Sequence, residues 1–185
     1  MSEKVLSIPY DLSLLQEMLR TPDDIGAVLR GHLILERCLV DKCAQFFPDI
    51  EKVYGQRLDL SHCLQLLRLI AAPEELINPC SKINKLRNQF AHGKLSKLSL
   101  PLVNEVRSLL PEKMRGFISS DSTKITDSNG NEVSPSQDDL PRMQLSIIVA
   151  LLQMQILSAN GVFHVDFGPH AKTPSLVWRS VDFDW

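Results

Sequence analysis

Long apolar runs, aromatic residues and secretion signals are scarce or absent in this 185-residue sequence. No stretch of eighteen apolar residues occurs, so we expect no membrane span. The opening residues, MSEKVLSIPYDL, are interrupted by acidic side chains and contain no apolar core of the kind found in a secretion signal. Aromatic residues make up only 6% of the chain, against 44% hydrophobic residues. This composition is typical of one helical globular domain and argues against a β-sandwich.

The sequence motifs of common nucleotide- and metal-dependent enzymes are also missing. There is no glycine-rich phosphate loop and no GxSxG, HExxH or EF-hand pattern. The four cysteines form no CxxC pair, and Cys38 and Cys43 are five residues apart, an unusual spacing for zinc ligands. The segment HVDFGPH, residues 164–170, is a weaker metal candidate, since such a cluster is more often polar surface. We therefore expect no metal, no cofactor and reduced, structural cysteines, which are typical of a cytoplasmic protein.

Charge is present but unevenly distributed. Residues 81–115 contain eight basic and two acidic side chains, a local charge of +6, whereas residues 1–80 and 116–185 carry −4 each, giving −2 overall. A basic segment inside an acidic chain indicates either a local surface that faces an anion or a solvated basic helix face. The acidic remainder would repel long RNA everywhere except at such a patch.

Apolar periodicity predicts an all-α fold within residues 1–160. A polar loop at 117–140 is rich in turn formers and is expected to be a loop or a short hairpin around Asn129–Gly130. Residues 161–185 are expected to form an irregular tail, in which alternating apolar residues at 163–167 allow a short strand. The expected helices cover 11–20, 24–47, 58–70, 78–92, 100–117 and 140–159.

Two of these helices are expected to pack against each other. The helix over 24–47 has an apolar stripe formed by Ile25, Val28, Leu29, Leu33, Leu35, Leu39, Val40 and Cys43. The helix over 78–92 should begin with Asn78 as N-cap and Pro79 at the first helical position, and should end at Gly93. Ile83, Leu86 and Phe90 of this helix are expected to contact Leu29, Leu33 and Val40. The last helix is apolar nearly all round, which indicates a core or interface position.

The stretch KINKLRNQFAHG, residues 82–93, places three chemically active side chains near one helix end. Asn88 and His92 are four residues apart and share a face, while Arg87 lies about 500° of rotation and roughly 7.5 Å of rise before His92. Arginine offers a planar fork for phosphate oxygens, and histidine exchanges a proton near neutral pH. These side chains fit metal-independent RNA cleavage. They also fit a structural role, in which His92 is a favourable charge at a helix C-terminus and Asn88 bonds to the backbone.

RNQFAH, Arg87 to His92, matches the RNxxAH form of the RX4–6H motif, and the chain thereby resembles the HEPN superfamily. Upstream, LRGHLILE, Leu29 to Glu36, resembles the first core helix of small bacterial members related to the mannitol-operon repressor family. The resemblance implies an antiparallel bundle of four to five helices. It also implies a metal-independent endoribonuclease of toxin–antitoxin or phage-defence systems, in which two copies line one cleft with their Arg/His motifs. Other relatives keep the fold as regulators or interaction modules.

Carried over by resemblance, Arg87 would bind the scissile phosphate and His92 would be the acid or base. Asn88 would orient the phosphate or His92. Glu36 falls where a polar residue of the earlier helix often meets the motif arginine, and His32 lies one turn before it on the same face.

Lys85 and Lys94 would add positive charge for RNA. Lys94 stands where toxins paired with a nucleotidyltransferase antitoxin often have tyrosine, so we expect no regulation by adenylylation there. The expected partners are RNA, a second copy of the chain and an antitoxin or defence protein. The alternative is a non-catalytic, mannitol-repressor-like regulator or interaction module.

Overall fold

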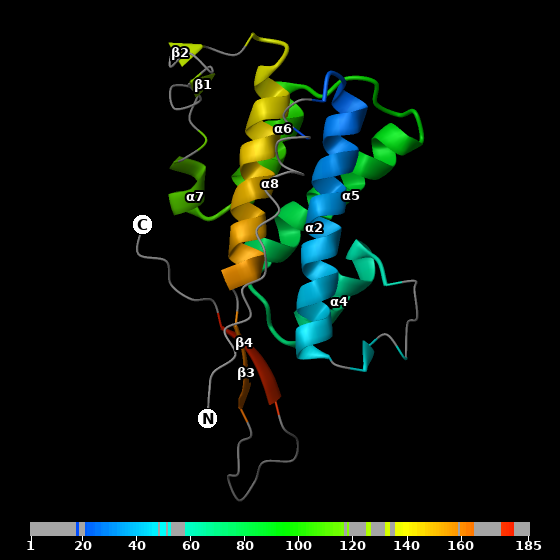
Figure 1. The fold of residues 1–185 in the computed structure, drawn as a ribbon, viewed down its shortest axis with the longest axis vertical. Helices are drawn as coiled ribbons and strands as arrows, with labels where there is room; N and C mark the ends of the chain where they lie inside the picture. The colour runs from blue at the N-terminus through cyan, green and yellow to red at the C-terminus, as the bar shows by residue number, and fades with distance from the viewer. Residues whose placement is uncertain are drawn as a thin grey trace, which may run out of the picture.

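The computed structural model describes residues 18, 21–47, 49–50, 52, 58–116, 118, 125–126, 132–133, 136–158, 160–164 and 175–179. The helices are α2 (Asp24–Phe46), α4 (Leu60–Leu69), α5 (Glu74–Ala91), α6 (Leu100–Ser108), α7 (Glu112–Gly116) and α8 (Leu140–Ser158). Four short strands accompany them: β1 (Ile125–Thr126), β2 (Glu132–Val133), β3 (Asn160–His164) and β4 (Ser175–Arg179). The expected helical bundle is confirmed (Figure 1).

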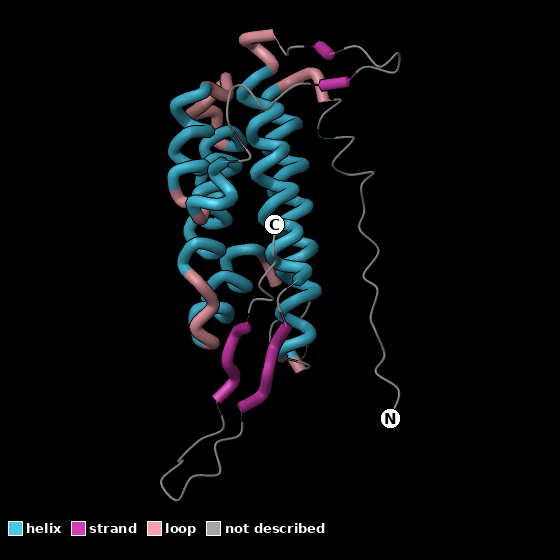
Figure 2. The backbone as a smooth tube through the Cα atoms, turned by 90° about the vertical axis from the view of Figure 1, so that its left-hand side faces the viewer, coloured by secondary structure: helices cyan, strands magenta, loops and turns pink. Residues whose placement is uncertain are grey.

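The bundle has two layers of helices around one apolar core. Helices α2 and α8 lie side by side, and α5, α4 and α6 pack behind them (Figures 1 and 2). We expected every pair of neighbouring helices to be antiparallel. Helices α2 and α8 instead run in the same direction (Figure 1). The segment containing α6, α7 and the β1–β2 hairpin returns the chain to the end where α2 begins, so α8 starts beside the start of α2. Helix α5 runs antiparallel to α2 and contacts it, as predicted.

Helix α2 begins where the acidic residues predicted. The side chain of Asp23 accepts a hydrogen bond from the Gly26 amide at 2.6 Å, which caps the helix. Leu35 and Leu39 are fully buried. Leu33, expected in the contact with α5, is instead 51% exposed. The apolar stripe predicted for α2 was therefore too wide. The helices packed against α2 cover only part of its apolar surface, and Leu33 lies outside the covered part.

Helix α5 starts earlier than predicted. Glu74 and Glu75 form its first turn, where acidic side chains interact favourably with the helix dipole. Pro79 therefore lies inside the helix rather than at its start, and Asn78 is not its N-cap. A proline at the sixth helical position removes one backbone hydrogen bond, and Pro79 is buried in the core.

The single helix expected over 100–117 is two helices. Helix α6 ends at Ser108, and α7 begins at Glu112, directly after Pro111. Proline lacks the amide hydrogen that an α-helix needs, and it disfavours the helical conformation of the residue before it. Pro111 should have been treated as a helix break.

Two hairpins flank α8. Strands β1 and β2 pair antiparallel, with Ile125 opposite Val133, which confirms the hairpin around Asn129–Gly130. The segment expected to be an irregular tail contains the antiparallel pair β3 and β4, with Val162 opposite Val177. Figure 2 shows this pair extending from the end of the bundle. The short strand expected at 163–167 overlaps β3 at residues 163–164, and residues 165–167 lie outside the described residues.

Helix α8 supplies much of the core, as its composition predicted. Leu145, Ile148, Val149, Leu152 and Ile156 are fully buried. On length and composition alone, α8 could cross a membrane, although the sequence contains no uninterrupted apolar run of that length. Because 56% of this stretch is buried inside the molecule, a core position accounts for its apolar character. The helix expected at 11–20 lies outside the described residues except for Met18, which is helical and buried.

A partly buried ionic cluster joins the beginnings of α2 and α8. Arg142 donates to Asp24 Oδ1 at 3.0 Å, to the Pro22 carbonyl at 3.2 Å and to Asp139. The other carboxylate oxygen of Asp24 accepts the Leu98 amide at 2.8 Å. Asp24 thus ties α2 both to α8 and to the segment that follows α5.

Replacing Asp24 with alanine should lower the free energy of unfolding by about 2 kcal/mol, measured by urea denaturation. The change leaves the Leu98 amide without its acceptor and weakens the hold on the partly buried Arg142 guanidinium. Asp138→Ala is the matched control, because Asp138 pairs with Lys97 where both side chains are largely exposed. We expect no measurable change from the control. Equal losses in the two variants would show that the Asp24 cluster contributes nothing special.

Candidate functional site

The C-terminal end of α5 holds the predicted motif at the surface. His92 is the C-cap, and Gly93 follows with a φ of 66°. The Lys94 amide donates to the Gln89 carbonyl at 2.8 Å, and the Gly93 amide donates to the Phe90 carbonyl at 3.0 Å. This is the hydrogen-bond pattern of a Schellman motif, in which glycine adopts a left-handed conformation. The prediction that Gly93 ends this helix is confirmed.

Gly93→Ala should lower the free energy of unfolding by about 1 kcal/mol in a thermal or urea melt. A Cβ at this position meets no neighbouring atom within 4 Å, so the cost comes from the left-handed backbone alone. Gly116→Ala is the control, since its added Cβ also has open space and its φ is not in the left-handed region. An unchanged melt for Gly93→Ala would mean that the turn after α5 relaxes without cost.

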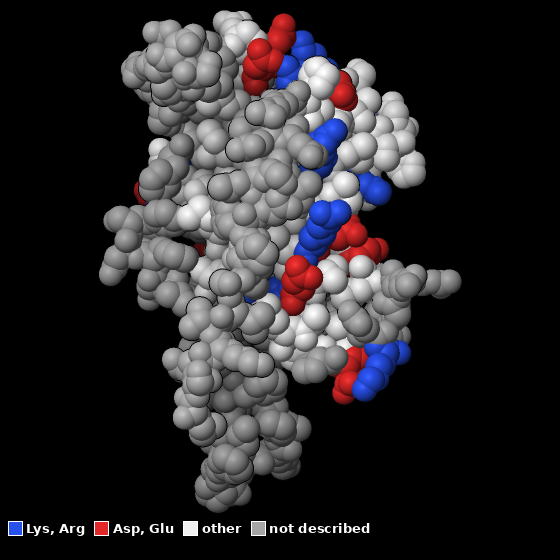
Figure 3. Space-filling model, viewed as in Figure 1, with Lys and Arg blue, Asp and Glu red and all other residues white. Residues whose placement is uncertain are grey.

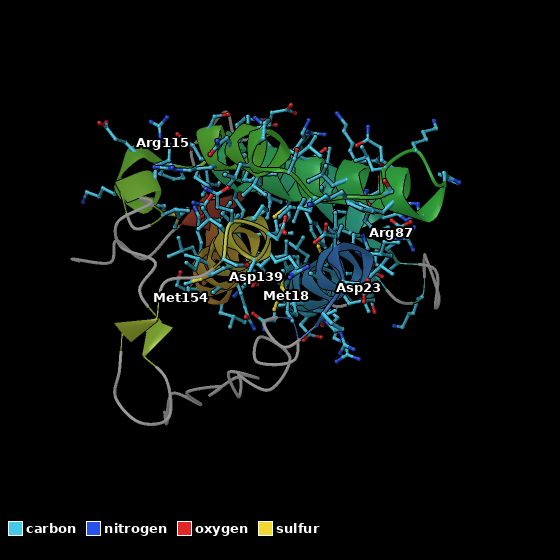
Figure 4. All side chains as sticks on the ribbon, turned by 90° about the horizontal axis from the view of Figure 1, so that it is seen from above. Met18, Asp23, Arg87, Arg115, Asp139 and Met154 are labelled. Atoms are coloured by element: carbon cyan, nitrogen blue, oxygen red, sulfur yellow. The ribbon has the colours of Figure 1, made fainter. Side chains whose placement is uncertain are left out.

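Arg87 is held at the side of α5 that faces α2 (Figure 4). Its Nη1 donates to Asn88 Oδ1 at 2.9 Å. Its Nε is buried and has no hydrogen-bond partner among the described residues. The Nε atom is covered by protein, but the Arg87 side chain as a whole is partly exposed, so a ligand would reach its guanidinium from the exposed part.

Beside Arg87, a polar contact joins α2 and α5 across 52 residues of sequence. His32 is 5% exposed, and its Nε2 lies 3.1 Å from Asn84 Oδ1. Its Nδ1 lies 3.3 Å from Glu36 Oε2, one turn further along α2. Burial lowers the pKa of His32, and the positive charge of Arg87 lowers it further, while Glu36 and Asn84 act in the opposite direction. The imidazole is thus held from both ring nitrogens.

His92 lies apart from this cluster. Its side chain is exposed and makes no hydrogen bond or ion pair with any residue that the structure describes. The structure joins Arg87 to Asn88, and His32 to Glu36 and Asn84. Glu36, expected to meet Arg87, forms no ion pair with it in the described part of the chain and contacts His32 instead. Lys85 and Lys94 are exposed on the surface of the same region.

The positive charge of residues 81–115 is partly offset by acidic partners. Lys82 pairs with Glu105, and Lys97 pairs with Asp138 at 2.8 Å. On the face shown in Figure 3, basic and acidic side chains are interspersed and do not gather into one basic patch. Because Glu105 is already counted in the local charge of +6, only the pair of Lys97 with Asp138 reduces that charge.

Sequence reasoning missed two polar side chains of the core region. Asn84 lies one turn before Asn88 on α5, and this spacing was the available signal for its place in the cluster. Lys42 is 4% exposed, and burial lowers its pKa. Its Nζ donates to Gln45 Oε1 at 3.1 Å and lies 5.8 Å from the centre of the Phe46 ring. No local pattern distinguishes Lys42 from a surface lysine.

The remaining histidines and cysteines offer no metal site among the described residues, where no group of three potential ligands occurs. His62, expected at the boundary between core and surface, is partly exposed, with Nδ1 2.8 Å from Asp59. The side chains of the HVDFGPH segment lie outside the described residues. All four cysteines are buried free thiols, and burial raises the pKa of Cys38 to about 11 and that of Cys80 to about 12.

Comparison of the chain with protein-family models, curated proteins and solved structures finds no match. The resemblance noted above therefore depends on the residues of RNQFAH and LRGHLILE and on the helices that hold them.

Proposed function

We propose that the chain is a metal-independent endoribonuclease of toxin–antitoxin or phage-defence type, related to the HEPN superfamily and acting in the cytoplasm. The observation that carries the proposal is the end of α5, where Arg87 is partly exposed and His92 is exposed five residues later. Arginine and histidine supply the two functions that RNA cleavage needs without a metal, charge stabilisation and proton transfer.

The proposed reaction uses the RNA 2′-hydroxyl as nucleophile. His92 accepts the proton of that hydroxyl or donates a proton to the leaving 5′-oxygen. Arg87 stabilises the negative charge that develops on the phosphorane, and Asn88 holds the guanidinium through its 2.9 Å hydrogen bond. The products are a 2′,3′-cyclic phosphate end and a 5′-hydroxyl end.

A second copy of the chain is part of this proposal. On one helix, five residues separate Arg87 from His92 by about 140° beyond a full turn, so the two side chains leave α5 in different directions. Two copies that face each other would allow the arginine of one motif and the histidine of the other to approach a single phosphate.

Light scattering at tens of micromolar should therefore report a dimer, and a monomer would contradict the shared-cleft arrangement.

The second candidate function is a non-catalytic regulator or protein-interaction module. It is favoured by the inward-facing contacts of the region, because Arg87 bonds to its neighbour Asn88 and His32 bonds across the α2–α5 interface. In this role the motif stabilises the bundle and cleaves nothing.

Incubation of a mixed RNA pool with the purified protein in EDTA separates the two functions. The nuclease proposal expects cleavage with 2′,3′-cyclic phosphate ends, and it expects expression of the protein alone to stop cell growth in a manner that His92→Ala relieves. Intact RNA at all protein concentrations, together with normal growth, would favour the regulator.

A further inference from the structure

His32 occupies an unusual position for a titrating side chain. It is buried between two helices, with Nε2 3.1 Å from Asn84 Oδ1 in a hydrogen bond and Nδ1 3.3 Å from Glu36 Oε2 in an ion-pair contact. A neutral imidazole has only one N–H group, whereas the imidazolium has two. The protonated form satisfies both acceptors, and the neutral form satisfies both only if the Asn84 amide rotates to present its NH₂ group.

The groups around His32 shift its pKa in opposite directions. Glu36 on the same helix and Asp59 at the start of α4 favour the imidazolium, while burial and the Arg87 guanidinium on α5 disfavour it. These are the charged groups that act on His32 among the described residues, and burial, the largest effect, keeps its pKa below the ordinary value of about 6.5 despite Glu36 and Asp59.

The charge of Arg87 is the one that an anion would neutralise. Arg87 is partly exposed, three residues after Asn84 on the same helix. A phosphodiester bound there would cancel the positive charge that opposes protonation of His32 and would add a negative charge nearby. Because coupling between two sites is reciprocal, protonation of His32 must then strengthen binding of the anion by the same factor.

We propose that His32 is a positioning residue that couples the binding of a phosphodiester at Arg87 to the uptake of one proton. The proton comes from solvent and resides on the imidazole, where its charge pairs with Glu36 while the hydrogen bond to Asn84 joins α2 to α5. The inference relies on the proposed function only for the contact between Arg87 and a phosphate. This coupling makes the affinity for the phosphodiester higher under mildly acidic conditions.

The test uses a short oligothymidylate made of 2′-deoxynucleotides as probe, because it cannot be cleaved and its phosphodiesters and bases do not titrate near neutral pH. Histidine NMR signals of the full-length protein are followed from pH 5 to 8 with and without the probe, and the His32 signal is assigned by its absence in His32→Gln. We expect the probe to raise the pKa of His32. We also expect binding to tighten by up to about tenfold per unit fall in pH in this range.

Variants and calorimetry give the second measurement. Titration of the wild-type protein in buffers of different ionisation enthalpy should show proton uptake on binding. His32→Gln should bind with little pH dependence and less uptake, whereas His92→Gln should retain the His32 contribution. Glu36→Gln, which keeps the shape of the side chain, should also reduce uptake because it removes the counter-charge.

The outcomes are distinguishable from those of the proposed function. An unchanged His32 pKa on binding overturns the inference even if RNA is cleaved. A raised His32 pKa without any RNA cleavage supports the inference and counts against the nuclease. No binding of the probe to the wild-type protein contradicts both. Calorimetry of the wild-type protein needs no variant, so a lack of proton uptake on binding overturns the inference even if His32→Gln fails to fold.

Discussion

His92→Ala should reduce RNA cleavage by about 10²–10⁴-fold, because it removes a general acid or base. His92 is exposed at the C-cap of α5 and has no partner among the described residues, so its loss should leave the bundle intact. The measurement is the rate of cleavage of a mixed RNA pool in EDTA, alongside melting curves of both proteins. Lys94→Ala is a suitable control, since it removes an exposed side chain two residues further on and should reduce affinity only.

Arg87→Ala should be comparably damaging, since it leaves the charge of the phosphorane unsupported. Arg87→Lys should rescue poorly, because a point charge cannot replace the planar fork that bonds to Asn88 and to phosphate together. The same assays apply, and Lys85→Ala, two residues before Arg87, controls for loss of positive charge alone.

The regulator makes the opposite forecast. In that role His92→Ala leaves every activity intact and lowers stability by no more than about 1 kcal/mol, as expected for a lost charge at a helix end. Equal cleavage by the wild-type and His92→Ala proteins would end the catalytic hypothesis for this residue.

Leu35→Ala should lower the free energy of unfolding by about 3 kcal/mol, the usual cost of an internal leucine-to-alanine change. Leu35 is fully buried on α2, the helix that also holds His32. The control is Leu33→Ala, two residues earlier on the same helix, where the leucine is 51% exposed. It should change stability by less than about 0.5 kcal/mol. Urea denaturation of the three proteins provides the comparison.

These two leucines test the fold as well as its stability. If Leu33→Ala cost as much as Leu35→Ala, the exposed side of α2 would be covered in solution by another surface, such as a second copy of the chain. Measurement at several protein concentrations separates this case, because stability that comes from association depends on concentration.

Local sequence signals predicted helix ends that are fixed by residues close by in the sequence and need no contact with a distant segment. Asp23 caps α2 because a carboxylate can accept the first free amide of its own helix, whereas Asp59, which caps α4, was expected inside that helix. Gly93 ends α5 because glycine adopts the left-handed conformation cheaply. Prediction failed at Pro79 and Pro111, where the same residue type stands inside one helix and separates two others. Proline restricts the backbone but does not reveal whether tertiary contacts compensate.

The candidate site divides in the same way. The sequence by itself determined the spacing of Arg87, Asn88 and His92, and hence that Arg87 and His92 leave α5 in different directions, because helix geometry fixes 100° per residue. Only the tertiary structure decided that His32 meets Asn84 across 52 residues, that Asp24 meets Arg142 across 118, and that Leu33 is exposed while Leu35 is buried. Such contacts depend on which faces of α2, α5 and α8 are brought together, and burial then sets the protonation of His32 by removing water from around it.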